Sequence, residues 1–284
     1  MTQHQKYQLT GDIYGTKLNQ QTDNQDEKTI LDELRNEIAK QQCITSILVH
    51  RLTELDCLFL QSTYLDPKEA AKRMAQYWQT RASLWGDDDF ENQELMPSQK
   101  DGLQQETKSK CCKLLPHQDQ FGRPLILIDW GCFLDCPYTV DGCQHELWDV
   151  LHQAMRGTDS KQKGRVVILI NATKLRLDTY DRMMFRMIFD QLNMMPMISI
   201  LHFCSFSKDS ADIIVPFLRF QMGKSLRARS FVHNGINDCR ELEMYGIPQH
   251  AQPLFLRSQQ CNKKRWNKFI FSSHFHHDHK AREA

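Results

Sequence analysis

The residues that could carry out chemistry do not fall in the pattern of a known enzyme. Cys204 follows an apolar run, as the nucleophile of a cysteine phosphatase does, but Ser210 stands where such a phosphatase needs the arginine that closes its phosphate loop. The sequence contains no GxGxxG, GxxxxGK[ST] or GxSxG turn to cradle phosphate or expose a catalytic serine. We therefore predict no catalytic residue and expect Cys204 to be a buried strand residue.

Two groups of potential metal ligands also lack a recognised spacing. The segment 274–279 has four histidines, but no cysteine or carboxylate site of known spacing surrounds them. Among the ten cysteines, Cys132, Cys136 and Cys143 lie close in sequence but form no CxxC pair. We predict no metal and no cofactor, and we expect mostly free thiols in a reducing compartment.

Composition restricts the class of protein. Lys and Arg number 36 against 35 Asp and Glu, so a net charge of +1 provides no global field for nucleic acid. The 40% of hydrophobic residues, with 12 Gly and 9 Pro, are typical of a packed globular chain. No apolar run approaches the roughly 20 residues that span a bilayer, and residues 1–30 are polar, unlike a secretory leader. We expect a cytoplasmic protein without a nucleic-acid partner.

Helices that would position a site are indicated in the N-terminal third. Residues 1–26 are polar and Gln-rich, which predicts a flexible tail. Over 27–95, apolar residues recur at three- and four-residue steps, so we predict a helical N-terminal region. Within it, Asp66-Pro67 supplies a helix cap and a first-turn proline, and that helix is expected to end near Gly86.

An α/β domain is indicated over residues 100–256. Four apolar runs have strand length and composition: 124–129, 166–171, 198–203 and 230–233. Segments with helical spacing separate them, and connections of more than twenty residues favour crossovers between parallel strands. We therefore predict a mainly parallel sheet. Residues 257–284 form a basic, His-rich C-terminal tail.

At the first of these runs the sequence DQFGRPLILIDWGCF resembles the CRAL-TRIO family of lipid-binding domains, whose D-x-x-GRP motif is matched by Asp119, Gly122, Arg123 and Pro124. GRVVILINATKL, the helix ending in MMP before ISILHF, and VPFLRFQMGKSLRARSFVHNG resemble later family segments in the same order. CLFLQSTYLDPKEAAKRMAQYWQTRASLWG resembles the small helical domain that precedes the lipid domain. The resemblance covers residues 45–256. It implies an α/β domain whose sheet floors an apolar pocket, with a small all-helical region before it.

The sequence departs from the family pattern at several positions, two of which fall near the pocket and the gate helix that the resemblance implies. Asn171 stands where the family has an acidic residue, Lys174 where it has the following glycine, and Ser205 where it has an asparagine. The usual glycine-containing ending is replaced by IPQHAQPLF. A protein-interaction module that keeps the fold without a ligand is therefore the alternative function.

By the resemblance, the pocket lies between the sheet and the helices over one face. The candidate lining residues are Trp130, Phe133, Trp148, Ile168, Ile170, Phe185, Ile188, Phe189, Leu192, Leu201 and Phe203. Because alternate strand residues point to opposite faces, we expect about half of the strand members to pack the other face. Ordinary core packing is the alternative role for each. Apolar burial at about 25 cal/mol per Å² would hold a hydrophobic ligand without covalent chemistry.

The segment 208–222 resembles the gate helix of the family. Ile213 and Phe217 belong to an apolar band in it, and Pro216 is expected to interrupt the helical hydrogen bonding. As a gate, the band would cover the ligand when closed and enter lipid when open. The alternative is a kinked core helix.

Four cations in and after this segment form the predicted head-group patch: Arg219, Lys224, Arg227 and Arg229. No acid follows until Asp238, and each cation near an anionic membrane contributes about 1 kcal/mol. The alternative is a solvated helix end whose cations complement its dipole. We predict non-covalent binding of a hydrophobic lipid, its transfer between membranes, and transient contact with anionic membrane surfaces.

Overall fold

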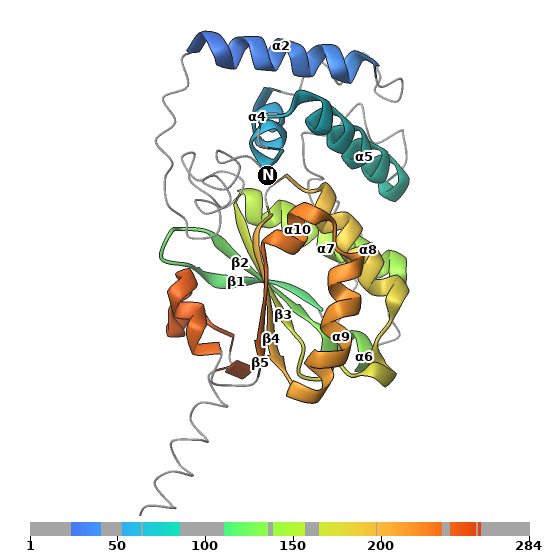
Figure 1. Cartoon of the computed structure of the whole chain (residues 1–284), viewed down its shortest axis with the longest axis vertical. Coiled ribbons are helices and arrows are strands. Elements are labelled where there is room, and N and C mark those ends of the chain that lie inside the picture. Colours follow the sequence, from blue (N-terminus) through green and yellow to red (C-terminus); the bar gives the residue numbers. More distant parts are fainter. Residues whose placement is uncertain are drawn as a thin grey trace, which may run out of the picture.

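A five-stranded sheet with the order β1-β2-β3-β4-β5 forms the centre of the molecule (Figure 1). The strands are β1 (Cys112–Gln118), β2 (Pro124–Asp129), β3 (Val166–Asn171), β4 (Ile198–Phe206) and β5 (Ser230–Asn234). β1 runs antiparallel to β2, and the other neighbours are parallel, which confirms the predicted sheet. β2 and β3 have the predicted bounds, whereas β4 and β5 extend farther than predicted.

The computed structural model describes residues 24–40, 53–63, 65–85, 111–135, 139–156, 165–196, 198–234, 239–253 and 255–256. The predictions for the basic, His-rich segment 257–284 and for most of the N-terminal tail lie outside these residues. The first described helix begins at Asn24, inside the segment predicted as tail.

The described helices precede, connect and follow the strands. Three belong to the N-terminal region: α2 (Asn24–Lys40), α4 (Thr53–Ser62) and α5 (Pro67–Trp85). Within the α/β part lie α6 (Trp130–Asp135), α7 (Val140–Arg156), α8 (Arg182–Met194), α9 (Lys208–Gln221) and α10 (Lys224–Ala228). Short 3₁₀ turns are η2 (Leu177–Thr179), η3 (Cys239–Tyr245) and η4 (Gln249–Ala251). Figure 1 shows α7, α8, α9 and α10 on one side of the sheet and η3 and η4 on the other.

The first strand was not predicted because its sequence, CKLLPHQ, has few apolar residues and a proline. Pro116 has no N–H to donate, and the register of β1 with β2 shifts between Leu114 and Gln118, on either side of it. Such an interruption is tolerated at the edge of a sheet, where β1 lies.

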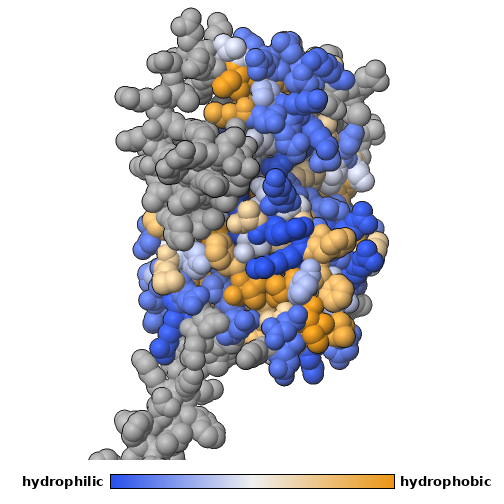
Figure 2. Space-filling view, viewed as in Figure 1, coloured by the Kyte–Doolittle hydropathy of each residue, from blue (hydrophilic) through white to orange (hydrophobic). Residues whose placement is uncertain are grey.

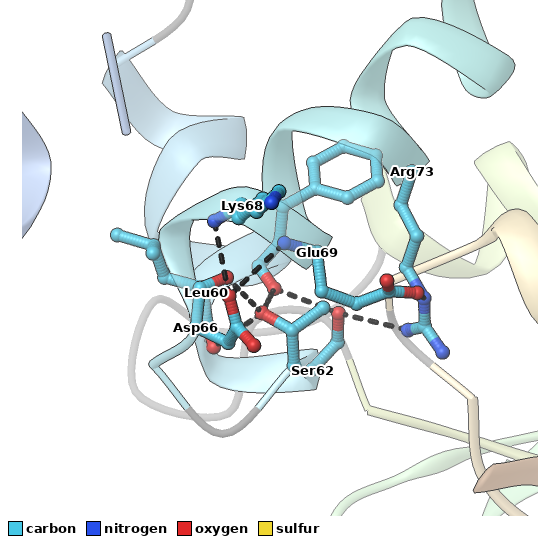
Figure 3. Close-up of polar contacts among 8 residues, drawn as sticks. Leu60, Ser62, Asp66, Lys68, Glu69 and Arg73 are labelled. Atoms are coloured by element: carbon cyan, nitrogen blue, oxygen red, sulfur yellow. Dashed lines mark hydrogen bonds and ion pairs between the residues drawn. The ribbon is translucent and has the colours of Figure 1, made fainter. Parts of the chain in front are cut away.

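The predicted start of α5 is confirmed. One carboxylate oxygen of Asp66, Oδ1, accepts hydrogen bonds from the backbone N–H groups of Lys68 at 3.0 Å and Glu69 at 3.1 Å (Figure 3). Arg73, one turn farther along α5, donates to the hydroxyl of Ser62 at 3.2 Å and so ties α5 to the end of α4. The two bonds to Asp66 satisfy backbone N–H groups that an α-helix leaves unpaired at its first turn.

Two apolar cores lie on opposite faces of the sheet. The larger core is on the helix-covered face and continues through α5 to Phe59 of α4 and Leu34 of α2. The smaller core packs Leu169 and Ile200 against Leu242 of η3 and Ile247. The helical N-terminal region therefore shares a core with the helix-covered side of the sheet.

The four predicted lining residues on strands all point to the helix-covered face, so the expectation that half would face away was wrong. Ile168 and Ile170 are two residues apart on β3, and they pair in register with Leu201 and Phe203 of β4. Residues two apart on a strand, and their registered partners on the next strand, share one face of a sheet.

Candidate functional site

A chain of aromatic side chains occupies the helix-covered side of the sheet. Trp130, the first residue of α6, stacks on Phe185 of α8 with ring centroids 4.0 Å apart. Phe185 lies 5.6 Å from Phe189, which in turn meets Phe203 of β4 edge-on at 6.3 Å. Phe133 lies 5.6 Å from Trp130. The end of β2, the middle of α8 and β4 together position this chain.

The aliphatic members of the predicted lining belong to the same core. They are fully buried or nearly so: Ile168, Ile170, Ile188, Leu192 and Leu201. The structure thus places these five residues in the same continuous apolar core as Trp130 and the four phenylalanines of the aromatic chain. Their role in ligand binding stays a prediction.

Trp148 lies at the junction between α7 and the N-terminal helical region. Its ring stacks on Tyr77 of α5 at 4.9 Å and lies 5.5 Å from Trp85. The Tyr77 hydroxyl bonds to Nε2 of His152 at 2.7 Å, and the other ring nitrogen of His152 bonds to the Trp148 carbonyl. The family resemblance placed Trp148 among the candidate lining residues, but it could not show that α5 provides its stacking partner.

Helix α9 has one buried and one exposed apolar face. Ile214 and Leu218 are 0% and 1% exposed and belong to the larger core. The two predicted gate residues lie on the outer face instead: Ile213 is 49% and Phe217 is 53% exposed. The helix continues through Pro216, so the predicted interruption does not end it.

Other exposed apolar residues lie on α9 and on two elements that it contacts. Phe220 of α9 is 79% exposed, Leu177 of η2 is 60% exposed and Met183 of α8 is 67% exposed. Both η2 and α8 contact α9. We call Leu177, Met183, Ile213, Phe217 and Phe220 the outer apolar surface. Figure 2 shows apolar residues gathered beside α9, next to strongly hydrophilic residues over α10.

Three of the four predicted head-group cations are exposed, and the fourth is not. Arg219, Lys224 and Arg227 are exposed at the end of α9 and in α10. Arg229 is 5% exposed, and its Nη1 donates to the carbonyl oxygen of Ile198 at 2.9 Å. A buried guanidinium that supports the start of β4 is not on the surface, so its assignment to the patch was wrong.

The D-x-x-GR motif is a structural feature. Arg123 and Asp119 form an ion pair with Nε and Oδ2 2.6 Å apart, and both side chains are almost completely buried. The other Asp119 oxygen accepts from the backbone N–H of Arg123 at 2.8 Å. The guanidinium also donates to the Ser199 hydroxyl and to the Tyr245 carbonyl, each at 3.1 Å. The pair therefore ties the turn between β1 and β2 to β4 and η3.

The departure at Asn171 also has a structural explanation. Its amide donates to a carboxylate oxygen of Asp129 at 3.0 Å, and its own oxygen accepts from the Thr173 hydroxyl at 2.6 Å. An acidic residue in this place would put a second carboxylate beside Asp129. Ser205 has φ 63°, a left-handed conformation in which asparagine is several-fold enriched and serine is uncommon.

A buried histidine pair on the opposite face of the sheet was missed by sequence reasoning. Nδ1 of His202 and Nε2 of His233 are 2.9 Å apart, and the two side chains are 0% and 2% exposed. Burial, with the nearby His233 and Arg123, lowers the pKa of His202 well below its usual range. Both residues lie within predicted strands, but neighbouring parallel strands bring them together, which sequence spacing does not reveal.

We expect the unfolding free energy to fall as pH drops below about 6.5, the ordinary histidine pKa. Unfolded His202 binds a proton there, whereas folded His202 binds one only at much lower pH, so acid favours the unfolded state. The slope for one such proton approaches about 1.4 kcal/mol per pH unit. Urea unfolding at about pH 7.5 and about pH 5.5 measures this change. The unfolding free energy of His202→Asn should differ less between the two pH values than that of the wild type. The exposed His117→Asn is the control, and equal slopes in wild type and His202→Asn would contradict the assignment.

Two further kinds of site are absent from the described part of the chain. No group of three or more His, Cys, Asp or Glu side chains in the described ranges is arranged to hold a metal ion. Among the described helices, none combines the length and apolarity needed to cross a membrane.

Comparison with solved structures shows a likeness in fold. No protein-family model and no curated protein matches the chain. The crystal structure of Sfh5, a Sec14-family CRAL-TRIO protein, superposes with a TM-score of 0.51 and 9% sequence identity. The match covers 75% of this chain and 82% of that chain. Together with the mostly parallel sheet and the preceding helices, it shows that the protein has a CRAL-TRIO-like α/β fold.

Proposed function

We propose that the protein binds a hydrophobic lipid without covalent chemistry and exchanges it with membranes, as a cytoplasmic protein that touches them peripherally. The observation that carries this proposal is the division of α9 into a buried face on the core and an exposed apolar face. Exposed apolar area costs about 25 cal/mol per Å² in water, and a contiguous patch is typical of an interaction site. The outer apolar surface would recover this free energy in lipid.

The position of α9 suits a gate. Ile214 and Leu218 pack into the core that contains the predicted lining residues, so outward movement of α9 would open that core. Movement into a bilayer would place the outer apolar surface in acyl chains at the same time. The likeness in fold to a Sec14-family protein supports a lipid ligand.

The exposed cations Arg219, Lys224 and Arg227 would orient this surface toward a membrane. Arg219 precedes Phe220 in the last turn of α9, and Lys224 and Arg227 follow in α10. Near an anionic bilayer each contributes about 1 kcal/mol, and this attraction falls with ionic strength. We propose that they speed the docking of α9.

A ligand-free interaction module is the second candidate. The observation in its favour is the direct contact between predicted lining residues, such as the stacking of Trp130 on Phe185 at 4.0 Å. Side chains that fill one another's van der Waals space form an ordinary core. In this case the outer apolar surface would bind a protein rather than a membrane.

One loading experiment tests the lipid function and the cations together. The protein is incubated with vesicles of phosphatidylcholine and phosphatidylserine that also contain a neutral long-chain alcohol, separated from them, and measured by native mass spectrometry over time. We expect stoichiometric lipid on the wild type. The triple variant Arg219→Ala, Lys224→Ala, Arg227→Ala should load severalfold more slowly at low salt and reach the same final occupancy, because the cations act on docking.

A matched variant controls for net charge. Lys68→Ala, Lys72→Ala and Lys113→Ala remove three exposed cations elsewhere, so they should leave the loading rate unchanged. A protein that keeps its lipid-free mass after vesicle incubation would favour the interaction module. Equal loading rates for both triple variants would remove the proposed role of Arg219, Lys224 and Arg227.

A further inference from the structure

The hydroxyl of Tyr180 is a buried polar group without a hydrogen-bond partner among the described residues. Tyr180 lies between η2 and α8, and its ring stacks on Phe185 with centroids 5.4 Å apart and planes 21° from parallel. Phe217 of α9 lies 6.3 Å from it on the outer side. The side chain is therefore placed between the buried aromatic chain and α9.

The other polar atom of this aromatic chain is already engaged. The indole N–H of Trp130 donates to the carbonyl oxygen of Thr179 at 3.3 Å. Along the chain from Phe133 to Phe217, Tyr180 is thus the residue that still has a donor and an acceptor to offer. Buried polar groups in folded proteins are almost always satisfied by other protein groups, by ordered water or by a bound ligand, so this hydroxyl is able to bond to a ligand at this place.

A second orphaned atom lies on the same seam. Gln221, at the end of α9, donates from Nε2 to the carbonyl oxygen of Arg182 at 3.4 Å, two residues after Tyr180. The amide oxygen of Gln221 is also shielded from solvent and has no partner among the described residues. The seam between α9 and residues 180–182 therefore holds a hydroxyl donor and an amide acceptor, both unsatisfied.

We infer that Tyr180, with Gln221 on the same seam, is the polar anchor of the ligand site, and that it selects a neutral lipid with a hydroxyl group at one end. This inference rests on the proposed lipid-binding function. The oxygen of the ligand hydroxyl accepts a hydrogen bond from the Tyr180 O–H, and the ligand O–H donates to the Gln221 amide oxygen. The apolar remainder of the ligand lies along the aromatic chain toward Phe189.

The surroundings of Tyr180 favour a neutral head group. Burial raises the pKa of Tyr180, so its hydroxyl keeps the proton that it donates throughout the physiological range. The rings of Phe185 and Phe217 on either side give a phosphate or carboxylate no compensation for lost water. A hydroxyl, in contrast, needs only the one or two hydrogen bonds that this seam supplies.

A pair of fluorescent probes that differ by one hydroxyl group tests the anchor. The probes are a pyrene-labelled long-chain alcohol and the matching pyrene-labelled hydrocarbon, both delivered from phosphatidylcholine vesicles. We expect the wild-type protein to prefer the alcohol. Tyr180→Phe keeps the ring and removes the hydroxyl, so it should lower affinity for the alcohol roughly five- to tenfold and leave affinity for the hydrocarbon unchanged.

Two further variants make the result specific. Gln221→Leu should also reduce the preference for the alcohol. Tyr77→Phe is the matched control, because the hydroxyl of Tyr77 already bonds to His152 at 2.7 Å. Its loss should destabilise the protein without changing the ratio of the two probe affinities.

The outcomes separate this inference from the proposed function. Binding of both probes with no change of their ratio in Tyr180→Phe would overturn the anchor and leave lipid binding intact. A wild-type protein that binds neither probe would overturn both. An equal loss of both probes in Tyr180→Phe would show a packing role for the ring and would also overturn the anchor.

Discussion

Arg123→Ala is expected to lower the free energy of unfolding by about 3–5 kcal/mol, the usual cost of breaking a buried ion pair. The substitution leaves the Asp119 carboxylate buried and without the guanidinium that it faces at 2.6 Å. It also removes the donors to Ser199 and to the Tyr245 carbonyl. Because these partners lie on β4 and η3, the loss should loosen the opposite face of the sheet as well as the turn. Urea unfolding followed by circular dichroism measures the change.

An exposed pair of the same kind provides the control. Arg186 and Asp190 on α8 are 3.7 Å apart, but both side chains are about two thirds exposed. Arg186→Ala should therefore cost less than about 1 kcal/mol, because solvent already screens this pair. The double variant Asp119→Leu, Arg123→Met should recover part of the loss, since it buries no lone charge. If Arg123→Ala and Arg186→Ala cost the same, the D-x-x-GR motif does not stabilise the fold in this way.

The sheet could be predicted from the sequence where burial on both faces produces unbroken apolar runs. β2 and β3 are such strands, and their predicted bounds agree with the structure. β1 was not predicted because it is an edge strand that contains a proline and few apolar residues. The short helices α6 and α10 were not predicted, because their lengths of six and five residues are too short for a helical period to repeat.

The candidate site was predictable as a set of apolar residues but not as an arrangement. The family resemblance places Trp148 and Phe185 among the lining residues, yet only the fold shows that one stacks on α5 and the other on α6. Charge alone grouped Arg229 with Lys224 and Arg227, although its side chain turns inward to the Ile198 carbonyl. The orphaned hydroxyl of Tyr180 has no sequence signal, because satisfaction of a polar group depends on neighbours from other elements.

Lipid binding and the ligand-free interaction module predict different effects when the same side chain of the predicted pocket is shortened. A side chain in an ordinary core loses its contacts permanently when it is shortened. A side chain at a ligand site leaves space that the ligand can occupy, and a ligand that binds only the folded state then restores stability. Phe185 is suited to this comparison because it is fully buried between Trp130 and Tyr180.

Phe185→Ala is expected to lower the free energy of unfolding of the lipid-free protein by about 3–5 kcal/mol, the usual range for a buried phenylalanine. It removes the ring that stacks on Trp130 at 4.0 Å and on Tyr180 at 5.4 Å. Aromatic pairs contribute about 0.5–1.5 kcal/mol beyond their buried area, so the loss should fall near the upper end. Urea unfolding of delipidated protein measures it.

Loading with lipid then distinguishes the two functions. Under the lipid-binding proposal, the pyrene-labelled alcohol fills the space left by Phe185→Ala and restores most of the lost stability, because binding adds RT ln(1 + [L]/Kd) to the folded state. Leu169→Ala is the matched control. Leu169 is equally buried but packs in the smaller core on the opposite face, so its loss of about 2–5 kcal/mol should not be recovered by the probe. If the probe rescues neither variant, Phe185 belongs to a permanent core, and the outer apolar surface of α9 is then better explained as a binding site for another protein.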